Sequence, residues 1–345
     1  MVLIISFLYI GCESESQFLQ QEIHTQGAQI EAQACSPHAI SVHRSTISPY
    51  TTVQQAIYGG IDPVKEDPII ASTLALFRQG DADYDFALVD GSATLISPTV
   101  ALGAAHTCEK FKPLFATIGP DLPYDYPVSF EEQLQQNPKG SMAQIVSCVM
   151  HPKYEEGAHQ PHDIALFYLS HQPEGSQVAS IIAPDSILPS QVTIAGFGAR
   201  SGQFDMWWEE IEAYRLQRVD TRISTIFEDR FLFMDGPNYG KGSCQGDSGG
   251  PIYKRIPREW NDQNQVDHED VESQARNAIE PLMPLVIGSV VMGPACEEGI
   301  GYNTDLRHYI EWIANQPQVE LKTYTLTSNM LDEKEDQSNR PILCK

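Results

Sequence analysis

The segment Gly242-Ser243-Cys244-Gln245-Gly246-Asp247-Ser248-Gly249-Gly250-Pro251 constrains this chain more than any other stretch. Glycines stand on both sides of an Asp-Ser pair, so the backbone can adopt positive φ angles and turn sharply with the Ser248 hydroxyl exposed. Such a turn can present a nucleophile. It can also aim the N–H groups of Gly246 and Ser248 at one point, where a developing oxyanion would be held. Because Gly, Asp and Ser are common turn residues, a plain surface turn is the alternative.

Composition and charge narrow the class of protein. A chain of 345 residues with 41% hydrophobic residues is long enough to bury one large core or two. The net charge of −24 repels phosphate backbones and anionic membrane surfaces, so we expect no nucleic-acid partner. Part of the acidity is local, because residues 259–280 carry many acidic side chains and only Arg276 as a base, which is typical of a solvated loop.

The N-terminal residues 1–12 are predicted to be an export signal. Residues 2–10 are almost all apolar, but the run is too short to span a bilayer as a helix. Gly11-Cys12 and the polar residues after it resemble a bacterial lipoprotein signal, in which Cys12 would carry a lipid and tether the chain to a membrane. A basic residue before the run is missing, so a plain secretory signal or a misplaced start remain alternatives. Each signal predicts an exported protein, extracellular or in the cell envelope.

Export makes disulfides the expected state of the cysteines. Six remain when Cys12 is set aside, and they permit fifteen pairings; they are Cys35, Cys108, Cys148, Cys244, Cys296 and Cys344. No Cys/His cluster has zinc-ligand spacing, and we expect neither a metal nor a cofactor. The acidic stretch 120–138 admits a calcium loop, but a solvated loop is favoured because its carboxylates match no ligand pattern.

The chain divides by composition into four parts. After the signal, residues 13–56 are rich in Gln, Ser and Thr and are interpreted as a pro-segment or linker. Residues 57–316 contain short apolar or β-branched runs separated by turn residues, a pattern that favours an all-β barrel or sandwich. Near their end, a helix capped by Asn303 or Thr304 is predicted. Residues 317–345 are predicted to be a polar tail.

The expected strands and the helical stripe are defined by their apolar residues. The strand runs are 69–77, 86–89, 93–96, 100–102, 144–149, 164–169, 192–195 and 285–292. The stripe, at i, i+3, i+4 and i+7, is formed by Leu306, Tyr309, Ile310 and Ile313.

Two further residues supply what a serine nucleophile needs. His106 follows a strand and the small residues Ala104 and Ala105, and Asp163 stands directly before the apolar run 164–169. A serine hydroxyl needs a neighbouring base, an imidazole can take its proton and later protonate the leaving group, and a buried carboxylate orients the imidazole. Alone, His106 is more often a packed or surface side chain and Asp163 a turn residue. The order His, Asp, Ser is one of the known chain orders for such a set.

With these residues in place, the chain resembles trypsin- or chymotrypsin-like serine endopeptidases from about Ile57 to Asn315. The resemblance implies two antiparallel six-stranded β-barrels with a C-terminal helix and the triad in the cleft between them. It also implies hydrolysis of peptide bonds through an acyl-enzyme, with protein or peptide substrates. The matching motifs are Ala104-Ala105-His106, Asp163-Ile164-Ala165-Leu166, Gly246-Asp247-Ser248-Gly249-Gly250-Pro251, Ile57-Tyr58-Gly59-Gly60 and His151-Pro152-Lys153-Tyr154.

The resemblance also implies disulfides. Cys244 and Cys296 fall where the family has a bridge beside the binding pocket. The usual cysteine after the histidine is displaced to Cys108, and Gly91 stands at the position of its usual partner, so that bridge is expected to be absent. Cys108 with Cys148 is the proposed substitute, which leaves Cys35 with Cys344.

Activation by cleavage before Ile57 is a third implication, because the new ammonium would pair with the buried carboxylate of Asp247. The preceding residue is Ala56, not Lys or Arg, so another kind of activating protease would be the partner in this step. We expect Ile57 to be the mature N-terminus.

The resemblance assigns the specificity pocket to three glycines. The residue six before the nucleophile is Gly242 rather than Asp, so cleavage after Arg or Lys is disfavoured. Gly293 and Gly301 align with the walls and would leave room for a medium or large apolar side chain. Val291 and Met292 stand where Ser and Trp are usual, so one hydroxyl contact to Asp163 is expected to be missing.

Two other functions compete with proteolysis. A binding protein of the same fold without turnover is the first alternative, because a fold does not determine a function. A lipase-like esterase is disfavoured by the order of the triad and by the absence of a βαβ pattern.

Overall fold

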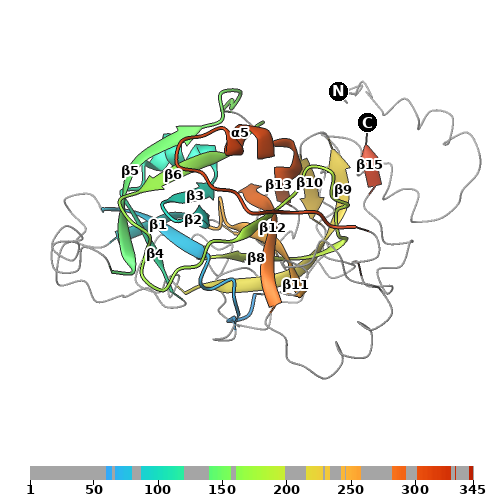
Figure 1. Ribbon diagram of the computed structural model, residues 1–345, viewed down its shortest axis with the longest axis horizontal. Helices are drawn as coiled ribbons and strands as arrows, with labels where there is room; N and C mark the ends of the chain where they lie inside the picture. Colours follow the sequence, from blue (N-terminus) through green and yellow to red (C-terminus); the bar gives the residue numbers. More distant parts are fainter. Residues whose placement is uncertain are drawn as a thin grey trace, which may run out of the picture.

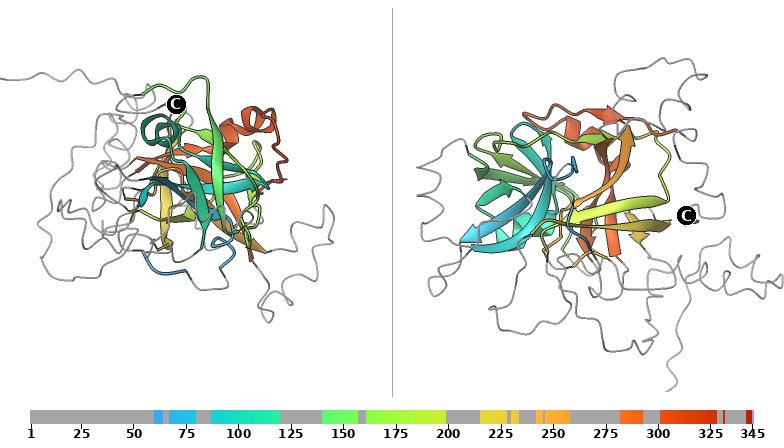
Figure 2. Two further views of the ribbon diagram at one scale, coloured as in Figure 1. Left: turned by 90° about the vertical axis from the view of Figure 1, so that its left-hand side faces the viewer. Right: turned by 90° about the horizontal axis from the view of Figure 1, so that it is seen from below.

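The computed structural model describes residues 60–63, 67–79, 87–119, 140–156, 161–198, 215–227, 230–233, 242–244, 246–257, 282–292, 301–327, 331 and 342–344. Two β-structures lie side by side, and the short helix α5 (Ile310–Ala314) covers one end of the region between them (Figure 1). The view from below separates the N-terminal strands, drawn in blue and green, from the C-terminal strands, drawn in yellow and orange (Figure 2).

The first β-structure is a closed barrel of six antiparallel strands in the order β1-β2-β3-β6-β5-β4. Its interior is filled by apolar side chains such as Leu74, Leu95 and Phe167, all fully buried. The strands are β1 (Thr73–Gln79), β2 (Ala87–Ser97), β3 (Val100–Gly103), β4 (Phe115–Ile118), β5 (Met142–Met150) and β6 (Ala165–Leu169).

Strand β2 corrects one expectation. The runs 86–89 and 93–96 predict two strands, because the turn residues Asp90-Gly91-Ser92 lie between them. In the structure these three residues belong to one continuous strand of 11 residues. Gly91 pairs with Leu76, and Ser92 pairs with Ala75. Pairing with β1 keeps Gly91 and Ser92 in the strand, and the Ser92 N–H bonds to the Ser248 carbonyl, so tertiary context overrides the local turn signal.

The second β-structure also closes. Strand β11 pairs with both β8 and β12, so six antiparallel strands follow one another around the ring β11-β8-β9-β10-β13-β12. The predicted pair of six-stranded barrels with a C-terminal helix is therefore confirmed. The strands of this ring are β8 (Gln191–Gly196), β9 (Gln217–Phe227), β10 (Arg230–Phe233), β11 (Pro251–Pro257), β12 (Leu282–Met292) and β13 (Gly301–Asp305).

Three further strands pair in parallel with the second sheet and were not predicted. Strand β7 (Ser180–Ile182) pairs with β12, β14 (Thr323–Tyr324) pairs with β7, and β15 (Ile342–Cys344) pairs with β9. Residues 317–327 of the expected tail thus lie against the domain, and Leu326 is buried in its core. The tail contributes packed structure that its polar composition did not indicate.

One apolar cluster runs between the two barrels. It includes Leu102 of the first barrel and Val290 of the second, both almost fully buried. The predicted helical stripe joins the same cluster, which confirms its role in core packing; its residues are Leu306, Tyr309, Ile310 and Ile313. The shared core fixes how the barrels face each other, and therefore how their loops meet.

The predicted helix cap is wrong by one or two residues. Asn303 and Thr304 belong to strand β13, and the side chain of Asp305 accepts a hydrogen bond from Arg307 N–H at the start of the 3₁₀ turn η5 (Leu306–His308). Asp305 also pairs with the Arg307 guanidinium at 2.7 Å. A carboxylate can satisfy a free amide at a helix start as well as Asn or Thr can.

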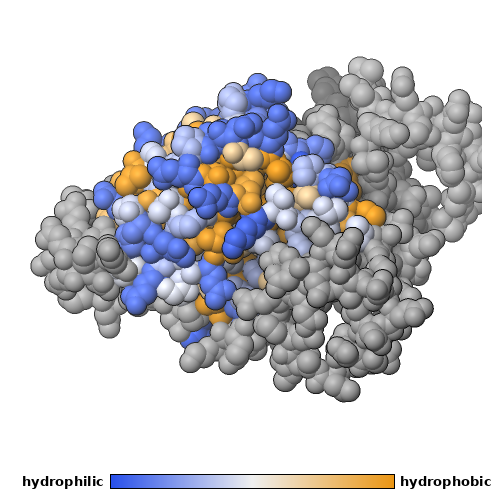
Figure 3. All heavy atoms as spheres, viewed as in Figure 1, coloured by the Kyte–Doolittle hydropathy of each residue, from blue (hydrophilic) through white to orange (hydrophobic). Residues whose placement is uncertain are grey.

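The described surface mixes polar and apolar residues on the face shown in Figure 3. Val146 and Leu114 are among the exposed large hydrophobic residues of the first barrel. Within the described ranges, no helix combines the length and apolar character needed to cross a membrane.

Candidate active site

The pairing of β3 with β6 brings His106 and Asp163 together. The strands are antiparallel with Gly103 opposite Ala165, so the end of β3 lies beside the start of β6. A Cβ at Gly103 would lie 2.7 Å from the ring of Phe167, so glycine permits this close approach. His106 follows β3 by three residues, and Asp163 precedes β6 by two. Both side chains are therefore delivered to one end of the first barrel.

Asp163 holds His106 through two hydrogen bonds. Its Oδ1 accepts the backbone N–H of His106 at 2.8 Å, and its Oδ2 lies 2.6 Å from Nδ1 of the ring. Asp163 is 1% exposed and His106 is 7% exposed. An ionised carboxylate accepts only, so the proton of a neutral ring sits on Nδ1 and Nε2 remains able to accept one.

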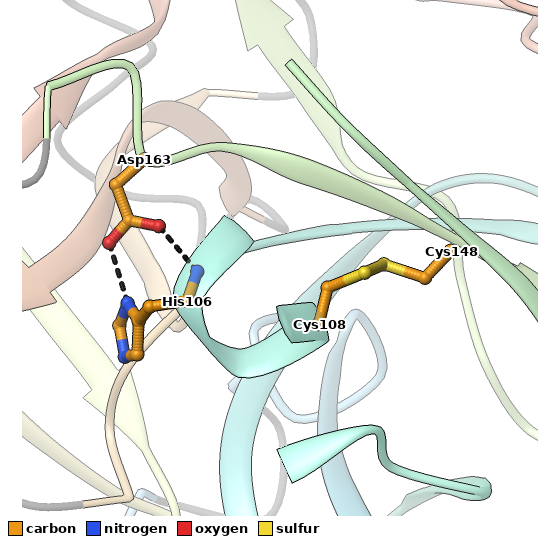
Figure 4. The surroundings of a disulfide bond; sticks show 4 residues. All are labelled: His106, Cys108, Cys148 and Asp163. Carbon is orange, nitrogen blue, oxygen red and sulfur yellow. Dashed lines mark hydrogen bonds and ion pairs between the residues drawn. A yellow bond between two sulfur atoms is a disulfide. The ribbon is translucent and has the colours of Figure 1, made fainter. Parts of the chain in front are cut away.

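The turn that carries His106 is anchored from its other side by a disulfide. Cys108 in η1 (Thr107–Phe111) is bonded to Cys148 in β5, 40 residues away. Figure 4 shows this bond and the His106–Asp163 pair on opposite sides of the turn. The proposed substitute pairing of Cys108 with Cys148 is confirmed. A Cβ added at Gly91 would lie 3.0 Å from the Thr107 side chain.

The nucleophile loop has the predicted backbone conformation. Gly246 and Gly249 have φ angles of 92° and 83°, which favour glycine. The Ser248 carbonyl accepts a hydrogen bond from Ser92 N–H of β2 at 2.8 Å. A Cβ at Gly249 would lie 2.7 Å from the backbone nitrogen of Ala104, so the loop packs on the segment that leads to His106. The loop of the second barrel therefore meets the histidine turn of the first.

The side chain of Ser248 hydrogen-bonds to the second barrel. Its Oγ donates to the carbonyl oxygen of Val291 at 3.4 Å, and no hydrogen bond to His106 is formed among the described residues. The distance marks a weak bond, since hydroxyl donors prefer about 2.7 to 2.8 Å. A rotation about one side-chain bond would release the hydroxyl.

Asp247, next to the nucleophile, is fully buried and accepts two backbone hydrogen bonds. Gly198 N–H donates to Oδ1 at 2.8 Å and Cys244 N–H to Oδ2 at 2.7 Å. Burial raises the pKa of this carboxyl to about 7, and the two amides lower it in part. A Cβ at Gly198 would lie 2.6 Å from the carboxyl carbon, so the pocket around Asp247 needs glycine there. The expected partner, the amino group of Ile57, lies outside the described residues.

The expected specificity residues are only partly described. Gly242 is buried just before Cys244, and Gly301 is buried at the start of β13, where its carbonyl accepts a hydrogen bond from the Asn303 side chain at 3.0 Å. Gly293 and Cys296 lie outside the described residues. Cys244 is disulfide-bonded, and its pairing with Cys296 remains a prediction.

The other sequence expectations near the site fall in the same gaps. Cys12, Cys35 and the acidic stretch 120–138 lie outside the described ranges. Among the described residues, no group of three or more His, Cys, Asp or Glu side chains is placed to hold a metal ion.

Two residues contact the site although no sequence signal indicated such a contact. Thr304 Oγ1 donates to the backbone carbonyl of Asp163 at 3.2 Å, which ties β13 of the second barrel to the carboxylate's own residue. Ser92 contacts the nucleophile loop with both its backbone and its side chain. Each belongs to an ordinary strand pattern, and only the packing of the two barrels shows what it touches.

The chain is similar in sequence to known proteins. Serine protease snk of Drosophila melanogaster is 27% identical over 251 residues, which cover 68% of this chain and 50% of that protein. Vitamin K-dependent protein C of Oryctolagus cuniculus is 23% identical over 264 residues, covering 69% and 50%. Trypsin-3 of Salmo salar is 28% identical over 190 residues, covering 51% and 73%. The chain thus spans about half the length of the first two relatives.

The sequence pattern of a whole family also matches. The model of the family described as Trypsin covers residues 78–313, which is well over half of the chain. That range includes the strands of both barrels from β2 to β13, His106, Asp163 and Ser248. The protein therefore belongs to the trypsin family.

Proposed function

We propose that the protein is an exported serine endopeptidase that hydrolyses peptide bonds through an acyl-enzyme on Ser248, with His106 as base and Asp163 as the group that orients it. The proposal is supported mainly by the two hydrogen bonds from His106 to the buried Asp163. The loop that carries Ser248 packs against the segment leading into that histidine. Family membership adds the chemistry that such a set performs.

The proposed mechanism has two half-reactions, and His106 acts first as base and then as acid in each. Ser248 Oγ attacks the carbonyl carbon of the scissile bond while its proton passes to Nε2 of His106. The N–H groups of Gly246 and Ser248 would stabilise the oxyanion. His106 then protonates the leaving amine as the C–N bond breaks. In the second half, His106 takes a proton from a water molecule that attacks the acyl carbon, and it returns this proton to Ser248 Oγ as the bond from Oγ to the acyl carbon breaks. Asp163 keeps the Nδ1–H tautomer and stabilises the imidazolium.

Specificity is proposed to favour apolar side chains over Arg and Lys. Gly242 places no carboxylate at the pocket floor, and Gly301 places no side chain at a wall. A buried cation without a partner would be costly in such a pocket. The third pocket residue in this proposal is Gly293.

Export and activation belong to the same proposal. Disulfides persist in oxidising compartments, and Cys108–Cys148 is one such bond. We propose cleavage before Ile57 by an activating protease, after which the new ammonium would pair with Asp247. Lipid attachment at Cys12 would add a membrane tether.

The proposal is tested with the exported protein and a fluorophosphonate probe that labels activated serines. We expect the label on Ser248, its loss in His106→Ala, and cleavage of a peptide library after apolar residues. The N-terminus of the active form should be Ile57. No labelling of wild-type protein whose pro-segment has been removed would overturn the catalytic role.

A binding protein of the same fold remains the competing function, and one observation favours it. Ser248 Oγ is bonded to the Val291 carbonyl rather than to His106. The same labelling experiment separates the two functions, because a silent protein would take up no probe while still folding and binding peptides.

A further inference from the structure

Ser92 connects three parts of the molecule through one buried hydroxyl. Its Oγ donates to the carbonyl oxygen of Gly246 in the nucleophile loop at 3.0 Å. The same oxygen accepts the backbone N–H of Phe197, in the turn after β8, at 3.0 Å. Ser92 itself belongs to β2 of the first barrel and is fully buried. The hydroxyl thus donates one hydrogen bond and accepts another, both with backbone groups of the second barrel.

The backbone of Ser92 holds the same loop at a second point. Its N–H donates to the carbonyl of Ser248 at 2.8 Å. Two carbonyls of the loop, on either side of Asp247, are therefore bonded to one residue of β2. Together these bonds fix the 246–247 and 248–249 peptide planes, one on each side of the Asp247–Ser248 peptide that carries the Ser248 N–H.

The adjacent amide of the 196–198 turn is bound from the other side. Gly198 N–H donates to the Asp247 carboxylate at 2.8 Å, and Phe197 N–H donates to Ser92. Successive amides of one turn are thus held by Asp247 and by Ser92. Asp247 links the turn to the nucleophile loop within the second barrel, whereas Ser92 links both to the first barrel.

Resting on the proposed function, we propose that Ser92 is a positioning residue for the reaction: its hydroxyl holds the loop at Gly246 so that the oxyanion donors stay aligned with His106. Without the hydroxyl, the Gly246 carbonyl and the Phe197 amide would be buried without partners. Buried groups of this kind are costly, so the loop would shift to find new partners. A shift of about 1 Å at a reacting centre can cost about 100-fold in rate.

The expected effect falls on the transition state. Oxyanion donors act where charge develops, so substrate binding before the reaction depends little on them. For Ser92→Ala we expect kcat to fall about 10- to 100-fold with KM nearly unchanged. Affinity for a peptide aldehyde, which forms a tetrahedral adduct with the serine oxygen, should fall in parallel.

A matched control lies on the same strand. Ser97, also fully buried in β2, donates through Oγ to the Gln318 carbonyl at 3.0 Å and accepts the Glu320 N–H at 3.2 Å. Ser97→Ala removes the same kind of hydroxyl, which donates one bond and accepts one, but the partners are Gln318 and Glu320 and not the nucleophile loop. It should lower the thermal stability as Ser92→Ala does and leave kcat and aldehyde affinity nearly unchanged.

The variants are compared with a chromogenic peptide amide, the aldehyde and thermal unfolding. Ser92→Thr, which keeps the hydroxyl, should recover most of kcat; Ser92→Cys fills the space with a weak donor and replaces Ser92→Ala if that variant does not fold. Equal kcat in wild type and folded Ser92→Ala or Ser92→Cys would overturn the inference. If Ser92→Ala raises KM and lowers kcat, and Ser97→Ala does the same, the inference would also be overturned, since such a shared effect indicates general destabilisation. Inactive wild-type protein would instead refute the proposed function itself.

Discussion

His106 and Asp163 are joined within one barrel, whereas Ser248 depends on contacts that cross from one barrel to the other. The histidine turn and the aspartate stand at the paired ends of β3 and β6, and two short hydrogen bonds link them directly. Ser248 is placed by Ser92 and by the packing of Gly249 on Ala104. The base and its orienting group form a local unit, and the nucleophile is added to it by tertiary packing.

The two sides also differ in what a small change would disturb. Misplacing the histidine requires breaking the Asp163 bonds or separating β3 from β6. The nucleophile loop contains glycines with positive φ and a buried carboxylate held only by backbone amides among the described residues. We therefore expect the His106–Asp163 pair to tolerate changes around it, and the loop that carries Ser248 to respond to changes in its surroundings.

The largest expected effect comes from removing either reacting group. Ser248→Ala and His106→Ala should each lower kcat by about 10⁵- to 10⁶-fold, and the double variant should be no worse than either single one. Groups that act as one unit give such non-additive losses. Steady-state kinetics on a peptide amide tests this, with Ser97→Ala as the control. Additive losses would show that the two sides act separately.

Asp163→Asn should have the next largest effect and probes the local unit. The carboxamide can offer its oxygen to the His106 amide and its NH₂ to Nδ1, which would favour the tautomer that cannot accept the serine proton. We expect kcat to fall about 10⁴-fold, the size known for the corresponding change elsewhere in the family. The exposed carboxylate variant Asp220→Asn should leave kcat unchanged. If Asp163→Asn lowers kcat only slightly, Asp163 does not hold His106 in its reactive tautomer.

Removing the Cys108–Cys148 disulfide tests whether the histidine side is self-sufficient. Because the cysteines are 40 positions apart in sequence, the double alanine variant should lose about 2 to 4 kcal/mol in free energy of unfolding. Because Asp163 still holds His106, kcat of the folded variant should stay close to wild type. Urea unfolding and kinetics at low temperature measure the two quantities. A fall in kcat as large as that of Asp163→Asn would break the comparison.

The final prediction concerns the pH dependence of stability on the nucleophile side and involves no expected change in kcat. Burial raises the pKa of Asp247 to about 7 from a model-compound value of 3.8, so the folded state keeps a proton that the unfolded state has lost. Between about pH 4 and 7 the free energy of unfolding should therefore fall as pH rises, by at most about 4 kcal/mol. Asp247→Asn has no carboxyl to titrate at this position. The difference between the wild-type and Asp247→Asn plots of unfolding free energy against pH therefore gives the contribution of Asp247.

The Asp247 experiment is done on the chain that still contains Ala56-Ile57 and repeated after cleavage. An ammonium partner would lower the pKa and reduce the pH dependence. The same pH profile in wild type and Asp247→Asn would contradict a buried, titrating carboxyl.

Much of the fold and the candidate site follows from local pattern. Short apolar runs with turn residues between them indicated the barrels, and Leu306, Tyr309, Ile310 and Ile313 indicated the packed helix face. The glycines around Asp247 and Ser248 indicated a loop with positive φ. Strand β14 was missed, because a short polar strand becomes stable only when it pairs with β7. The cap at Asp305 was missed, because pairing in β13 extends the strand through Asn303 and Thr304.

The sequence by itself determined the residue types, their order His106, Asp163 and Ser248, and the glycine positions that permit a tight loop, because these depend on chemistry and backbone freedom along the chain. Only the tertiary structure decided that β3 and β6 deliver two of them to one place, that Cys108 bonds Cys148, and that Ser92 reaches the Gly246 carbonyl. Those contacts join residues far apart in sequence, and their geometry depends on how two closed barrels pack around a shared core.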